Sequence, residues 1–149
     1  MKILLPTDGT QFSDAATSAL QRLRLGEGDT IRVISVVDMS VPLGIDLYGG
    51  YLPDTAEVEA KARESADRII GETCGRLRGA LGDDVAIESD VLFGSPDSRI
   101  VETAEETGAD LIVLGSHGYR RWERLLLGSV SHSVVHHAPC SVMIVRGEL

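Results

Sequence analysis

Apolar residues along the chain fall into short continuous runs that alternate with stretches where they recur every three or four positions. Continuous runs are typical of buried strands, and three-to-four spacing is typical of one helix face. The runs predict five strands, at 2–5, 31–37, 85–93, 110–114 and 141–146. The spaced stretches predict four helices, from 12 to 23, from 54 to 81, from 95 to 107, and from about 128 to just before Pro139.

This alternation predicts an α/β fold: one domain over residues 1–149, with an open, doubly wound parallel sheet of five strands and right-handed crossovers. Ligands of such sheets bind beyond the carboxyl ends of the strands, at the point where the strand order reverses. One long irregular stretch, 38–53, is rich in glycine and proline. We interpret it as either a functional flap or a mobile connection.

Composition narrows the class of protein. No apolar run approaches the roughly 18 residues of a membrane span. Only three apolar residues lie between Lys2 and Pro6, too few for a signal-peptide core. Two cysteines cannot form a disulfide framework, and no Cys-x-x-Cys pair indicates zinc. We therefore expect a cytoplasmic protein.

The net charge of −9 is unevenly distributed. Residues 1–110 carry 21 acidic and 10 basic residues, whereas residues 111–149 carry two acidic and four basic residues. An acidic body repels nucleic acid and anionic membranes, so neither is an expected partner. The C-terminal quarter, with Arg120, Arg121 and Arg124, is where an anion would be tolerated. The acidity itself fits adaptation to high salt or plain solubility, and a GC-rich genome would equally explain why arginine outnumbers lysine.

The strongest local signal is Gly115-Ser116-His117-Gly118, followed after nine residues by Gly128-Ser129-Val130-Ser131. Glycines after a strand let backbone amides approach an oxyanion, and the amides and dipole of a helix start favour phosphate. Ser129 and Ser131 add hydroxyl donors, and the three arginines could meet a triphosphate. The Walker and dinucleotide-binding glycine patterns are absent from the sequence.

Gly-x-x-Gly, nine residues, Gly-Ser resembles the ATP-binding signature of universal stress proteins, complete here as Gly115, Gly118, Gly128 and Ser129. The resemblance extends over the opening Ile3–Gly9, Val36-Val37-Asp38, the strand 110–115 and Pro139–Val142. It implies a fold of the adenine nucleotide alpha hydrolase type. By position, it implies that Asp8 lies beside ribose and adenine and that the Val36 backbone reads adenine. The full set of implied nucleotide contacts is Pro6, Thr7, Asp8, Val36, Gly115, His117, Gly118, Gly128, Ser129, Val130 and Ser131.

The resemblance further implies a regulatory ATP-binding module in the stress response, dimerising through its last strand, Val142, Met143, Ile144 and Val145. The resemblance leaves open whether AMP or ADP is bound in place of ATP. It also leaves open whether a Mg²⁺ or Mn²⁺ ion accompanies the nucleotide. An alternative is slow ATP hydrolysis or phosphoryl transfer onto Ser129 or Ser131, although the sequence shows no evident catalytic base. A nucleotide-free interaction protein is a third reading, against which the complete glycine set argues.

Structural interpretations compete with these assignments at single residues. Asp8 precedes glycine and could serve as a turn residue. His117 could point to water. His132 and His136 stand four apart on a helix, where two ligands suit a metal, but without an evident third ligand we interpret them as a solvated face. Cys140 is interpreted as a small buried residue, not a reactive thiol.

Overall fold

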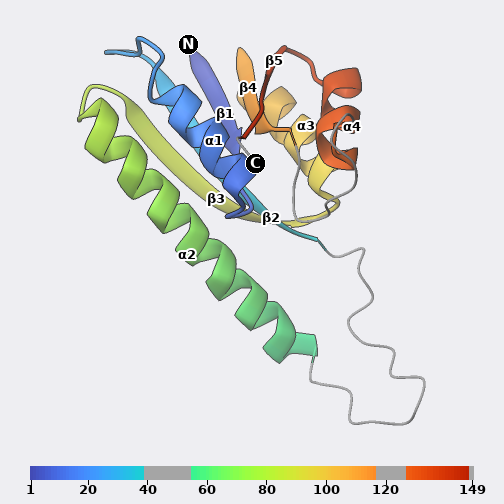
Figure 1. Cartoon of the computed structure of the whole chain (residues 1–149). Helices are drawn as coiled ribbons and strands as arrows, with labels where there is room; N and C mark the ends of the chain where they lie inside the picture. The colour runs from blue at the N-terminus through green and yellow to red at the C-terminus, as the bar shows by residue number, and fades with distance from the viewer. Residues whose placement is uncertain (39–54, 117–126, 148–149) are drawn as a thin grey trace, which may run out of the picture.

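The five apolar runs form one parallel sheet in a computed structural model that describes residues 1–38, 55–116 and 127–147 (Figure 1). Its spatial strand order is β3-β2-β1-β4-β5. The strands are β1 (Lys2–Pro6), β2 (Thr30–Asp38), β3 (Ala86–Gly94), β4 (Leu111–Gly115) and β5 (Ser141–Val145). The helices are α1 (Gln11–Leu20), α2 (Thr55–Leu81), α3 (Pro96–Thr107) and α4 (Ser129–His137). The predicted α/β architecture of five strands and four helices is confirmed.

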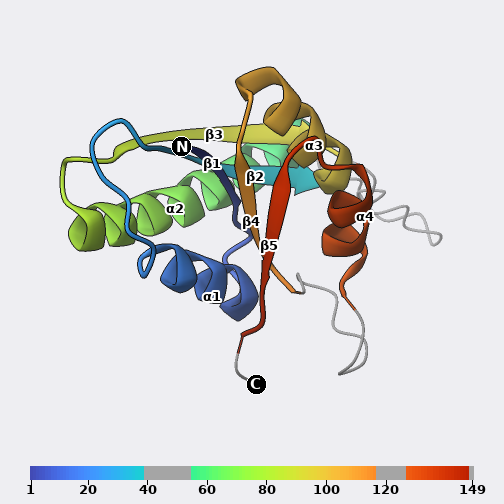
Figure 2. The ribbon, with the colours of Figure 1, turned by 90° about the horizontal axis from the view of Figure 1, so that it is seen from above.

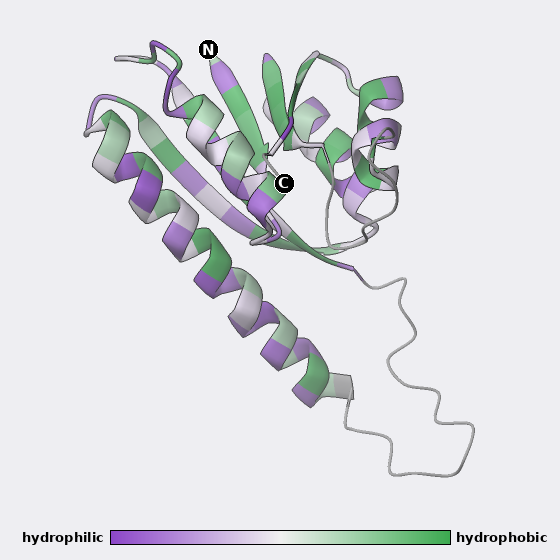
Figure 3. Cartoon of the chain, viewed as in Figure 1, coloured by the Kyte–Doolittle hydropathy of each residue, from purple (hydrophilic) through white to green (hydrophobic). Residues whose placement is uncertain are grey.

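Helices cover both faces of the sheet (Figure 2). On the side of α1 and α2, alternate strand residues such as Leu5 and Val33 pack with Leu20 and Leu77. The intervening strand residues, such as Ile34, pack on the other face beneath α3 and α4. Because both faces are covered, β1 beyond Lys2 and β4 are almost wholly apolar, as Figure 3 shows by colour.

The strand order reverses between β1 and β4. β1 pairs with β2 on one side and with β4 on the other, all in parallel. The pairing with β2 continues one residue past β1, where the Thr7 amide donates to the Ile34 carbonyl at 2.8 Å. The chain therefore leaves β1 and β4 in divergent directions, which opens a crevice at their carboxyl ends.

One helix start and one helix end differ from the sequence prediction, and one further helix start stays untested. α1 ends at Leu20, not near Leu23. Leu23 packs against the core from a turn that follows the helix, so its burial does not require the helix to continue. Ser95 is the residue before α3, as expected, but its hydroxyl donates to Asp97 and caps no backbone amide. Asp54, expected to cap α2, lies outside the described residues, as does the stretch 39–53.

Among the helices that the structure describes, none is both long enough and apolar enough to cross a membrane. The longest, α2, has 27 residues, but only a narrow stripe of it faces the sheet (Figure 3). That stripe is buried at Ala66, Ile70, Cys74 and Leu77, whereas the remaining faces carry charged residues. The length of α2 therefore reflects amphipathic packing on the sheet.

Candidate functional site

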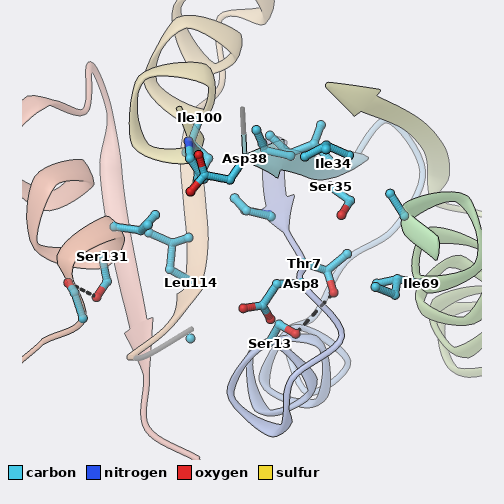
Figure 4. Close-up of a pocket in the computed structure, with 18 of the residues that line it drawn as sticks. Thr7, Asp8, Ser13, Ile34, Ser35, Asp38, Ile69, Ile100, Leu114 and Ser131 are labelled. Atoms are coloured by element: carbon cyan, nitrogen blue, oxygen red, sulfur yellow. Dashed lines mark hydrogen bonds between the residues drawn. The ribbon is translucent and has the colours of Figure 1, made fainter. Parts of the chain in front are cut away.

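A cavity of about 520 Å³ lies at the carboxyl ends of β1, β2 and β4 (Figure 4). α1 and α2 border it on one side, and the first turns of α3 and α4 border it on the other. Its position matches the switch point of the strand order. The residues that line it are Pro6, Thr7, Asp8, Ser13, Ile34, Ser35, Val36, Val37, Asp38, Ala62, Ser65, Ala66, Ile69, Pro96, Ile100, Leu114, Gly115, Gly128, Ser129, Val130 and Ser131.

The cavity gathers every member of the sequence-predicted set that the structure describes. Nine residues from four separate segments meet there: Pro6, Thr7, Asp8, Val36, Gly115, Gly128, Ser129, Val130 and Ser131. His117 and Gly118 lie outside the described residues, as do the three arginines of 120–124. That these nine residues contact a nucleotide stays a prediction, but their convergence on one cavity is a property of the fold.

The turn after β1 places Asp8 at the cavity. One carboxylate oxygen of Asp8 accepts hydrogen bonds from the Thr10 amide at 3.0 Å and from the Thr10 hydroxyl at 2.7 Å. Gly9 completes the turn with a φ of +73°, and a Cβ there would lie 3.0 Å from Ile69 of α2. The turn and cavity readings of Asp8 are therefore compatible, since one oxygen holds the turn while the residue lines the cavity.

Three hydroxyl side chains form a buried polar floor. Thr7, Ser13 and Ser35 are each 5% exposed. The Thr7 hydroxyl donates to Ser13 Oγ at 3.3 Å, and the Ser13 hydroxyl donates to the Thr10 carbonyl at 3.0 Å. Ser35 lines the cavity, and its Oγ points into it (Figure 4). A serine hydroxyl in this position can donate one hydrogen bond to a ligand or to water and accept others.

The sequence prediction missed most of the cavity wall. Ser13, Ser35 and the α2 residues carry no motif, and α2 enters the site only because it packs beside β2. One sequence feature could have identified Ser35: it is a polar residue within the apolar run of β2. It lies on the same face of the strand as Val33, which is buried. Ile34, Ile100 and Leu114 supply an apolar wall suited to a flat ring.

The first turn of α4 supplies hydrogen-bond donors. Gly128 precedes the nine-residue helix in an extended conformation, with a φ of −60°. No acceptor within the described part of the chain is assigned to the backbone amides of Ser129, Val130 and Ser131. Such amides, at the positive end of the helix dipole, favour an anion. The Gly128 amide is different, because it donates to the Ser116 carbonyl at 2.8 Å.

The Ser131 hydroxyl does not have the free hydrogen that the sequence led us to expect. Its Oγ donates to the carbonyl oxygens of Ser116 and Gly128, each at 3.0 Å, and Ser131 is 3% exposed. A serine hydroxyl has one hydrogen, so both contacts share it. Ser129, by contrast, is exposed at the cavity.

Charge at the cavity is sparse. Asp8 and Asp38 are its acidic lining residues, and no lysine or arginine is among the lining residues in the described ranges. Backbone amides are therefore the positive element that the described structure offers to an anion. Arg120, Arg121 and Arg124 lie outside the described residues, so their contribution of positive charge is an expectation from the sequence alone.

The other candidate chemistry stays outside the cavity lining. His132 and His136 are exposed on α4, with ring centroids 4.6 Å apart. Within residues 1–38, 55–116 and 127–147, no group of three or more metal-ligating side chains forms. Cys140 is half-buried and packs against the core beneath α3 and α4, and burial raises the pKa of its thiol. A raised pKa disfavours the reactive thiolate.

Solved structures share this fold. The structure of the hypothetical protein MJ0577 matches with a TM-score of 0.83 at 24% identity, over 99% of this chain and 96% of that one. The *Arabidopsis thaliana* universal stress family protein At3g01520, solved with AMP bound, matches with a TM-score of 0.72 at 15% identity, over 99% and 92%. A universal stress protein in complex with cAMP matches with a TM-score of 0.67 at 21% identity, over 99% and 98%. At these identities the likeness establishes the fold alone.

Sequence similarity is more specific. The model of the universal stress protein family matches residues 1–146. Universal stress protein MJ0531 of *Methanocaldococcus jannaschii* is 33% identical over 148 residues, 97% of this chain and 81% of that protein. A putative universal stress protein of *Staphylococcus aureus*, SAUSA300_1656, is 31% identical over 147 residues, 98% of this chain and 84% of that protein. With the family match running from the first strand through the last, this chain belongs to the universal stress protein family.

Proposed function

We propose that the cavity binds an adenine nucleotide, with ATP as the leading ligand, and that the protein is a nucleotide-dependent regulator in the stress response. The observation that carries the proposal is the pairing of two chemically different walls in one cavity. An apolar wall with buried hydroxyls stands near helix amides that have no assigned acceptor in the described part of the chain. A nucleotide has the same division between a flat neutral base and an anionic phosphate chain.

The proposed pose follows this division. The base lies against Ile34, Ile100 and Leu114, with the backbone of Val36 at its edge. Asp8 holds the ribose through the carboxylate oxygen that does not support the turn. The phosphates meet the amides of the first α4 turn and the Ser129 hydroxyl.

Relatives support the choice of ligand. Solved structures of the same fold include one with AMP bound and one in complex with cAMP. Both ligands share the adenosine part and differ in the phosphate. An accompanying Mg²⁺ or Mn²⁺ ion would depend mainly on nucleotide oxygens, as is usual for Mg²⁺ at phosphate sites. Among the described residues no cluster of three metal-ligating side chains is present to hold it alone.

Titration calorimetry with ATP, ADP, AMP and GTP tests the proposal. We expect saturable binding of the adenine nucleotides, weaker binding of GTP, and no binding to protein whose cavity is blocked by Ser35→Trp. Absorbance and mass analysis of the purified protein give an independent check through co-purified nucleotide. Accumulation of ADP during incubation with ATP would favour the enzymatic alternative, and absence of any binding would contradict the proposal.

We further propose that the protein is a homodimer through β5. β5 is the last strand in the order and pairs with β4 on one side. The Ser116 amide donates to the Val145 carbonyl, so the polar groups of Val145 face β4. Backbone groups of successive residues point to opposite sides of a strand, which turns those of Ile144 outward. A second copy of β5 would satisfy these outward groups.

A further inference from the structure

One buried hydroxyl connects the two halves of the glycine motif. Ser131 Oγ lies 3.0 Å from the carbonyl oxygen of Ser116 and 3.0 Å from that of Gly128. The Ser116 carbonyl also accepts the Gly128 amide at 2.8 Å. Ser116 is 5% exposed and Ser131 is 3% exposed, so the hydrogen bond between them is shielded from water, whereas the one to Gly128 is partly buried. We name this arrangement of Ser116, Gly128 and Ser131 the hydroxyl clamp.

The hydroxyl clamp connects α4 to the sheet. The Ser116 amide donates to the Val145 carbonyl of β5 at 2.9 Å. The same residue then accepts from Gly128 and Ser131 at the start of α4. The first turn of α4 is thereby held to the end of β4 and, through Ser116, to β5.

The chemistry of Ser131 suits it to this task better than to binding an anion. Its single hydroxyl hydrogen is directed to two carbonyl oxygens, which leaves lone pairs as its remaining hydrogen-bonding capacity. Lone pairs repel phosphate oxygens. A serine hydroxyl that reaches back to the carbonyl three residues earlier is also a recurrent local contact.

We propose that Ser131 is a positioning residue: its hydroxyl holds Ser116 and Gly128 together so that the amides of the first α4 turn, which have no assigned acceptor among the described residues, face the cavity. The proposal rests on the proposed function for the identity of the anion, a nucleotide phosphate. Loss of the hydroxyl leaves the Gly128 amide bond in place but removes a buried side-chain hydrogen bond that fixes how α4 is turned relative to Ser116.

Ser131→Ala and Ser131→Thr test the hydroxyl clamp in nucleotide-free protein. Exchange of the Gly128 and His132 amides is followed by NMR, because these amides donate to the two carbonyls that Ser131 contacts. We expect exchange about five- to tenfold faster in Ser131→Ala, the loss expected for one shielded hydrogen bond. Ser131→Thr keeps the hydroxyl and restores the slow exchange. Circular dichroism confirms that each variant is folded.

Affinity for ATP and for adenosine supplies the second readout. Ser131→Ala is expected to weaken ATP binding about five- to tenfold and to leave adenosine binding within twofold, because adenosine has no phosphate to meet α4. Unchanged amide exchange in Ser131→Ala would overturn the hydroxyl clamp, and ATP loss alongside it would assign Ser131 as a direct contact. If wild-type protein binds neither ligand, the nucleotide function fails while the exchange experiment still decides the clamp.

Discussion

Gly115 at the end of β4 lies directly against the first turn of α1 at Phe12. A Cβ on Gly115 would stand 2.6 Å from both the carbonyl carbon and the carbonyl oxygen of Phe12. Real Cβ atoms do not approach backbone so closely, and the backbone of a helix turn cannot move aside as a side chain can. The first glycine of the motif is thus required by helix-to-sheet packing, independently of any ligand.

Gly115→Ala should therefore destabilise the protein by about 1–3 kcal/mol, the usual cost of forcing an added group into a packed interior. Urea denaturation measures the loss. Gly75→Ala is the matched control, because Gly75 lies in the exposed face of α2 with nothing within 4 Å of the added Cβ. That control should gain up to about 1 kcal/mol from helix propensity. Equal urea midpoints for Gly115→Ala and wild type would refute the packing requirement.

Asp97 connects α3 to α4 in a way that depends on pH. Hydrogen bonds from the Ser95 hydroxyl at 2.6 Å and the Ser133 hydroxyl at 2.8 Å lower the pKa of Asp97 below its ordinary value. Because the folded pKa is depressed, the stabilisation is present above the unfolded value of about 3.9. It is lost as the pH falls through the lower folded value.

Ser133→Ala should accordingly cost about 1 kcal/mol at pH 7, the net value of one hydrogen bond. The difference from wild type should shrink as the pH is lowered below about 4. Thermal unfolding over a pH series measures both effects. Ser98→Ala is the control, because Ser98 is exposed and lies next to Asp97 in the first turn of α3. This substitution should leave stability unchanged at every pH. A Ser133→Ala difference that stays constant from pH 7 to pH 3 would contradict the role of Asp97.

Gly128→Val addresses the proposed phosphate end of the cavity. The φ of −60° at Gly128 suits any residue, so backbone strain is not the reason for an effect. We expect ATP affinity to fall more than tenfold because a branched side chain enters space beside the helix amides, while stability falls by about 1 kcal/mol from the poorer N-cap. Calorimetry and urea denaturation separate the two quantities. ATP affinity equal to that of wild type would place the phosphates elsewhere.

Ile144→Pro tests the proposed dimer. Proline removes the outward amide of Ile144 but none of the bonds that β5 makes with β4, so the fold should survive. Sedimentation velocity should show wild-type dimer and variant monomer. Ser141→Ala, at the exposed start of the strand, keeps every backbone amide of β5 and serves as the control that should remain dimeric. A folded Ile144→Pro variant that still sediments as a dimer would show that the interface lies elsewhere.

Much of the fold follows from local sequence. Apolar runs and helical spacing located all five strands and four helices, because burial imposes a period of two or of about 3.6 on the residues themselves. The end of α1 was missed because Leu23 reaches the core through a turn, which periodicity does not distinguish from a longer helix. The glycine motif likewise indicated where β4 ends and where α4 begins.

Only the tertiary structure decided what each of these residues does. Gly115 faces α1, and Ser131 donates to Ser116 and Gly128, although both stand in a motif that by itself indicates phosphate contacts. Ser35 and the α2 wall join the cavity without any motif. A sequence records which groups are available, whereas the direction of a side chain and the hydrogen bonds that already occupy it depend on segments that only folding brings together.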